Sequence, residues 1–143
     1  MRSEVSGGCF CGAARFRVHA TPHYVNHCHC SMCRGCSGAL FVSWATIDRS
    51  NFEWTTREPS YLRSSARARR GFCALCGTAL TWEHYPDPEH LGATLDVTLG
   101  SLDDPNAFSP QEHIWVANQA RCLRFADGLP RRSGDTKSDL LSE

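Results

Sequence analysis

Three cysteines within six residues form the densest chemical feature of the sequence. They follow the spacing Cys28-x-Cys30-x-x-Cys33, and Gly35 and Gly38 come directly after them. Thiolate sulfur is the ligand that zinc and other soft divalent ions prefer, and a glycine-rich turn lets several sulfurs approach one ion. The spacing therefore predicts a metal site on a tight turn that continues into a single turn of helix.

The number of protein ligands at this site decides what chemistry it can do. A tetrahedral zinc with three protein ligands keeps a position free for catalysis, whereas four protein ligands make it structural. Cys36 follows Cys33 by three residues, so the two are neighbours if the turn is helical, and Cys36 or a histidine can complete the set. His27 and His29 flank the cysteines and are candidates for a supporting hydrogen bond or a proton relay. The residues alone do not decide between a site with three protein ligands and a site with four.

Two further cysteine pairs each supply half of a metal site. Cys9 and Cys11 form one pair between glycines, and Cys73 and Cys76 form the other, followed by a glycine. Together they offer four thiolates, which predicts a closed, structural zinc that joins the N-terminal segment to a later part of the chain. Such a site contributes about 10 kcal/mol or more to folding. The remaining cysteine, Cys122, is isolated, and we expect it to be a buried, small apolar residue.

Composition limits the other classes of function. The chain has 143 residues, 15 basic and 15 acidic, so a nucleic-acid binder that relies on bulk positive charge is not expected. The N-terminus leads into no apolar run, which argues against a signal peptide or a membrane span. Nine cysteines without such a signal favour metal binding in a reducing compartment. The predicted location is therefore the cytoplasm.

The hydrophobic pattern predicts a mainly β domain with little helix. Apolar residues alternate with polar ones, or form short β-prone runs, and no long amphipathic helix is visible. The expected strands lie at 13–18, 24–27, 39–45, 52–55, 61–64, 78–82, 93–99 and 113–116. We expect one zinc-binding domain over residues 1–130 and a polar C-terminal tail over residues 131–143.

Three cysteine motifs in this order carry a resemblance to a known family. They are Gly8-Cys9-x-Cys11-Gly12, Cys28-His29-Cys30-x-x-Cys33-Arg34, and Arg70-x-Phe72-Cys73-x-x-Cys76-Gly77, with His113-Ile114-Trp115-Val116 and Asp127-Gly128-Leu129-Pro130 closing the pattern. The sequence resembles the glutathione-dependent formaldehyde-activating enzyme family, also called the centromere protein V/Gfa-like domain. The resemblance extends from about Gly7 to Pro130.

This resemblance implies an Mss4-like fold of β-sheets folded over one another, with two zinc ions per chain. It implies a structural zinc at Cys9, Cys11, Cys73 and Cys76. At Cys28, Cys30 and Cys33 it implies a catalytic zinc with an open position. The implied activity is condensation of glutathione with formaldehyde to S-hydroxymethylglutathione, filed as a carbon-sulfur lyase. Arg34 is then a candidate donor to the oxyanion that develops on the aldehyde.

We therefore hypothesise a zinc-dependent carbon-sulfur lyase whose partners are a small thiol and an aldehyde. The competing interpretation is a non-catalytic zinc module that binds a protein partner. An open coordination position beside Cys33 would distinguish the two.

Overall fold

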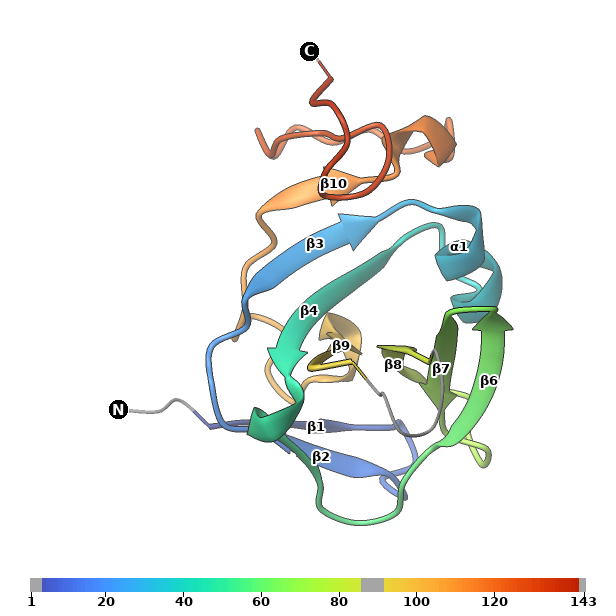
Figure 1. The fold of residues 1–143 in the computed structure, drawn as a ribbon, viewed down its shortest axis with the longest axis vertical. Helices are drawn as coiled ribbons and strands as arrows, with labels where there is room; N and C mark the ends of the chain where they lie inside the picture. The colour runs from blue at the N-terminus through green and yellow to red at the C-terminus, as the bar shows by residue number, and fades with distance from the viewer. Residues whose placement is uncertain (1–3, 86–91, 142–143) are drawn as a thin grey trace.

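The structure, a computed structural model, describes residues 4–85 and 92–141 and consists of two sheets with one short helix (Figure 1). The small sheet has the strand order β1 (Val5–Gly8), β2 (Arg15–Val18) and β5 (Phe52–Trp54). The large sheet has the order β10 (Glu112–Ile114), β3 (Tyr24–Cys28), β4 (Val42–Asp48), β9 (Thr94–Thr98), β8 (Ala79–His84), β7 (Ala68–Phe72) and β6 (Ser60–Ser65). The fold is mainly β, with cysteines on short turns, as expected for the Mss4-like class.

Helical structure is limited to short pieces. The only α-helix among the described residues is α1 (Ser31–Ser37), and the 3₁₀ turns are η1 (Arg49–Asn51), η2 (Leu99–Ser101) and η3 (Val116–Asn118). Gly38 ends α1 in the left-handed conformation, with φ of 74°. No helix among the described residues is long and apolar enough to cross a membrane.

Each predicted strand corresponds to an observed one, but the bounds differ. The strand expected at 113–116 ends at Ile114, because Trp115 takes the left-handed conformation and Val116 begins η3. The strand expected at 39–45 begins only at Val42, because the residues directly after α1 are used to leave the helix. Strands β1 and β7 were not predicted. The first contains two glycines and the second contains adjacent arginines, so neither shows the usual apolar pattern of a strand.

The large sheet has a core face and a cavity face. On the core face, apolar side chains pack against the small sheet around the fully buried Phe16. The core members on the large sheet include Val25, Ala45, Ile47, Leu95 and Val97. Because side chains alternate along a strand, their neighbours point to the other face.

One row of directly paired residues crosses that second face. It runs from Tyr24 on β3 through Thr46 on β4, Asp96 on β9 and Trp82 on β8 to Arg70 on β7. The large sheet is strongly curved, so that this face is concave and α1 lies between the end of β3 and the β6 edge (Figure 1). The arrangement gives one side of the sheet the polar and aromatic groups from which a binding site can be built.

The C-terminal part of the chain extends this sheet. β10 pairs in parallel with β3, and residues 131–141 follow beside β10 through backbone hydrogen bonds such as Arg132 N to His113 O. Arg132 also forms an ion pair with the buried Glu112, which accepts a hydrogen bond from Tyr24. Residues 131–141 therefore pack against the domain in the structure.

Gly7 tests how tightly the two sheets are joined. A Cβ atom at Gly7 would lie 2.5 Å from Phe16 Cζ and 2.6 Å from Ser101 O, whereas at Gly35 in α1 it would meet nothing within 4 Å. We expect Gly7→Ala to lower the free energy of unfolding by about 1–3 kcal/mol through overpacking. Gly35→Ala, the control, should raise it slightly because alanine favours helix. Chemical denaturation of both variants checks this, and equal effects would contradict it.

Candidate metal centre

Cys9, Cys11, Cys73 and Cys76 come together as predicted from their spacing. Their sulfur atoms all lie within 4.8 Å of one another, with 3.6 Å between Cys9 and Cys11 and 3.7 Å between Cys11 and Cys73. Four sulfurs at 2.3 Å from a tetrahedral ion are about 3.8 Å apart, whereas a disulfide requires about 2.0 Å. The donor set and its spacing therefore fit one tetrahedral metal ion.

Both turns of this four-sulfur cluster depend on a glycine in the left-handed conformation. Gly12 and Gly77 have φ of 82° and 81°, and each donates its N–H to the carbonyl of the first cysteine of its pair. Hydrogen bonds from the hydroxyl and the amide of Thr78 lower the pKa of Cys76 to about 5. The turns thus orient hydrogen-bond donors toward sulfur and favour the thiolate that a metal requires.

The second cluster forms where β3 ends and α1 begins. The sulfurs of Cys28, Cys30 and Cys33 lie within 4.8 Å of one another. Cys30 is the N-cap of α1, and its sulfur accepts a hydrogen bond from Cys33 N at 3.2 Å. Hydrogen bonds from the thiols of Cys28 and Cys33 hold the pKa of Cys30 far below its usual value. This three-sulfur cluster therefore has the ligand types and the spacing for a second metal ion.

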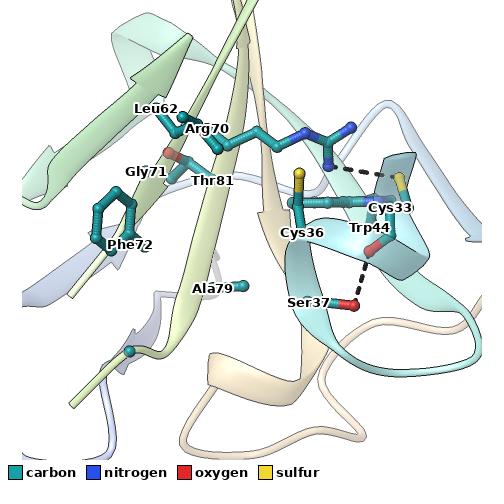
Figure 2. A pocket seen from close by; sticks show the side chains of 11 residues that line it. Cys33, Cys36, Ser37, Trp44, Leu62, Arg70, Gly71, Phe72, Ala79 and Thr81 are labelled. Atoms are coloured by element: carbon teal, nitrogen blue, oxygen red, sulfur yellow. Dashed lines mark hydrogen bonds between the residues drawn. The ribbon is translucent and has the colours of Figure 1, made fainter. Parts of the chain in front are cut away.

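Cys36 lies outside the three-sulfur cluster. It is exposed on the next turn of α1 and is not among the cysteines whose sulfurs converge there. Figure 2 shows Cys36 at the edge of a separate cavity of about 220 Å³, which also borders Cys33 and Arg70. In this arrangement the protein offers three sulfurs to the site, and Cys36 does not complete a fourth.

Arg70 is the charged side chain closest to the three-sulfur cluster. It is 7 % exposed, and its Nη1 donates to Cys33 Sγ at 3.6 Å (Figure 2). The ion pairs of the described residues include no carboxylate partner for it. A buried cation needs a counter-charge, and three thiolates around one divalent ion carry a net charge of −1. Arg70 therefore fits a metal-loaded cluster electrostatically.

Sequence reasoning proposed Arg34 for the role near the cluster and overlooked Arg70. In the structure Arg34 donates to the backbone carbonyls of His29 and Asn118, so its guanidinium is used to hold the chain. Arg70 lies in an arginine-rich strand that looks solvated in the sequence. The burial of Ala68 and Arg70, beside the more exposed Arg69, is visible only in the structure.

The three-sulfur cluster opens onto a cavity of about 510 Å³. Its walls include Trp44, Trp82 and Trp115, with Arg70 beside the cysteines. Asp135 and Thr136, from the C-terminal segment, also border it. Cavities of this size, with mostly apolar walls and a few polar groups, are typical of small-molecule sites.

Asp96 is the carboxylate that lies on the sheet within this cavity. Burial raises its pKa to about 6, against a hydrogen bond with Thr46 and the positive charges of His84 and Arg70. The sequence placed Leu95, Val97 and Leu99 on one face of this strand, so Asp96 belonged to the other. That this other face lines a cavity depends on the curvature of the sheet and could not be read from the strand.

His27 and His29 point away from the cavity. His29 Nε2 lies 2.9 Å from His113 Nδ1, and His113 Nε2 lies 2.8 Å from Asp127 Oδ2. His27 Nδ1 bonds to Ser43 Oγ at 2.7 Å. His27, His113 and Asp127 bring three ligand atoms within 4.8 Å, but each of these side chains already makes a hydrogen bond within the protein. His29 and His113 therefore fasten β10 to the end of β3, and His27 links β3 to β4.

Cys122 differs from expectation. It is exposed, because residues 120–123 form a surface turn closed by Leu123 N to Ala120 O. The prediction of a buried thiol at this position is wrong.

The two clusters predict different effects of cysteine loss. Cys76→Ser should unfold the domain. The four-sulfur cluster joins segments 62 residues apart, and without the metal the entropy lost in bringing them together is not compensated. Cys30→Ser should leave the domain folded, because the three-sulfur cluster closes only a short loop. Circular dichroism melts decide between them, and an equal loss of structure in both variants would show that the two clusters share the structural task.

Asp96 predicts a stability that depends on pH. Its pKa is raised from 3.8 to about 6, so between these values the unfolded chain loses this proton while the folded protein keeps it. The free energy of unfolding therefore falls as pH rises through this window. Asp96→Asn should melt higher than wild type at pH 7.5, with a smaller difference at pH 5. Asp135→Asn, which changes an exposed carboxylate, is the control, and a difference for Asp96→Asn that does not vary with pH would contradict the assignment.

A family model and a solved structure both match this chain. The sequence model of the family described as "Glutathione-dependent formaldehyde-activating enzyme" matches residues 4–118. A crystal structure of a Rhodobacter sphaeroides protein shares the fold, with a TM-score of 0.54, 22% identity, and coverage of 73% of this chain and 91% of that chain. A search of curated proteins gave no match. With its family pattern extending over both cysteine clusters, the chain belongs to the glutathione-dependent formaldehyde-activating enzyme family.

Proposed function

We propose that this protein is a zinc-dependent carbon-sulfur lyase that joins a small thiol to an aldehyde and reverses that reaction. The pair named by its family, glutathione and formaldehyde, would give S-hydroxymethylglutathione. The observation that carries the proposal is a cluster of three sulfurs, not four, that opens onto a cavity of about 510 Å³. Three protein ligands with room for an exogenous one is the arrangement of a catalytic zinc site.

Two zinc ions per chain would divide the structural and catalytic tasks. Cys9, Cys11, Cys73 and Cys76 would hold the structural ion, and Cys28, Cys30 and Cys33 would hold the catalytic one. The catalytic ion would supply a lowered pKa for a bound thiol, so that its thiolate persists at neutral pH. The nine free cysteines of the chain suit a reducing compartment such as the cytoplasm.

The chain's own residues would orient the reaction and stabilise its charge. In the forward direction the thiol sulfur attacks the aldehyde carbon, the carbonyl π bond breaks, and the thiol proton ends on the resulting hydroxyl. Arg70 would place positive charge beside the reacting sulfur and the developing oxyanion. The indoles of Trp44, Trp82 and Trp115 would displace water from this end of the cavity, which strengthens that electrostatic interaction.

The proposal is tested by removing Cys36 and Cys33 separately. Cys36→Ala should keep two zinc ions and thiol binding, because Cys36 lies outside the cluster, whereas Cys33→Ser should lose one zinc and thiol binding together. The measurements are metal analysis, glutathione binding by calorimetry, and the rate of S-hydroxymethylglutathione formation above the spontaneous reaction.

The test also requires that zinc-loaded wild type bind glutathione. Zinc-loaded wild type that ignores glutathione, with a Cys36→Ala variant that sheds zinc, would end the enzyme interpretation. The protein would then be a zinc module that binds a protein partner.

A further inference from the structure

The sheet wall of the large cavity carries two opposite charges, Arg70 and Asp96, in two separate places, and the exposed Asp135 borders the cavity from the C-terminal segment. Arg70 contacts Cys33 at the sulfur end. Asp96 lies two strands away in the same row, since it pairs with Trp82, and Trp82 pairs with Arg70. Neighbouring strands are about 4.8 Å apart, so the backbones of Asp96 and Arg70 are separated by about 10 Å. The cavity is therefore positive beside the cysteines and negative at a distance from them.

Asp96 is surrounded by groups that favour an organic cation. Trp82 is its direct neighbour on β8 and Thr46 its neighbour on β4. Trp44, which pairs with Thr98 two residues further along β9, supplies a second indole to the same cavity. Indole faces attract ammonium groups, most strongly where water is excluded. A cation at the Asp96 carboxylate would therefore lie in a cavity that is walled in part by two indoles.

Within the part of the chain that the structure describes, the ion pairs leave Asp96 without a cationic partner. The nearest charges that act on it are those of Arg70 and His84, and Arg70 is turned to Cys33. Burial raises the pKa of Asp96 to about 6, so the group is mostly ionised at pH 7.5 with its charge poorly compensated. A cationic group on a ligand would supply the missing counter-charge.

We propose that the cavity selects a thiol that carries an ammonium group and that Asp96 binds this group while the sulfur lies at the three-sulfur cluster. The inference rests on the proposed function, because it takes the cluster as the sulfur end. A separation of two strand spacings suits a thiol whose ammonium lies several bonds from its sulfur, as in the γ-glutamyl group of glutathione. Asp96 is then a specificity-determining residue, and it takes no part in bond formation.

The test compares two ligands that differ only in the amino group. They are glutathione and its deamino analogue, glutaryl-cysteinyl-glycine, titrated by calorimetry at pH 7.5 without aldehyde into zinc-loaded wild type, Asp96→Asn and Asp139→Asn, the last of which changes an exposed carboxylate outside the cavity lining. Wild type should bind glutathione about 10- to 100-fold more tightly than the analogue, the range for one hydrogen-bonded charge pair. Asp96→Asn should reduce glutathione affinity to that of the analogue and leave the analogue's affinity unchanged. Asp139→Asn should keep the preference.

Each other outcome counts against the inference. Equal affinity of wild type for the two thiols would overturn it and leave the proposed function standing, and this comparison requires no variant to fold. An equal loss of both affinities in Asp96→Asn would make Asp96 a structural residue and overturn it as well. Wild type that holds zinc and binds neither thiol would overturn the proposed function, and this inference with it.

Discussion

Contact between sulfurs that are 62 residues apart in the chain fixes how the two sheets meet. Cys9 and Cys11 lie between β1 and β2 of the small sheet, whereas Cys73 and Cys76 form the turn between β7 and β8 of the large one. This hairpin also carries Arg70 and Trp82 into the cavity. The four-sulfur cluster therefore determines the position of the cavity wall as well as the join between the sheets.

Alternation along the strands divides the structural and chemical tasks between the two faces of one sheet. On β3, Val25 packs into the core while Cys28 belongs to the three-sulfur cluster. On β9, Leu95 and Val97 are core residues while Asp96 borders the cavity. Polar and charged residues are thus held on rigid strands whose opposite side is anchored by apolar packing. The sheet side of the cavity thereby gains a fixed geometry.

Much of this organisation was visible in the sequence because cysteine spacing and period-2 hydrophobicity are local signals. The grouping of all seven clustered cysteines and most strands followed from them. Arg70 and Asp96 were missed because a charged residue gives no local sign that a curved sheet will enclose it. Whether Cys36 joins the three-sulfur cluster could not be decided from the sequence for a similar reason. Spacing of three residues brings a side chain close on a helix, but the direction of α1 relative to the other sulfurs is set by tertiary packing.

The parallel pairing of β10 with β3 has a consequence for how the protein matures during synthesis. All seven clustered cysteines have been translated once Cys76 has emerged, so both metal clusters can assemble on an incomplete chain. The wall residues Ile114, Trp115, Asp135 and Thr136 arrive later, and domains fold as the chain emerges. A metal ion that bound at that stage would meet a cysteine site that is still uncovered, and these later residues would then convert an exposed turn into a shaped cavity.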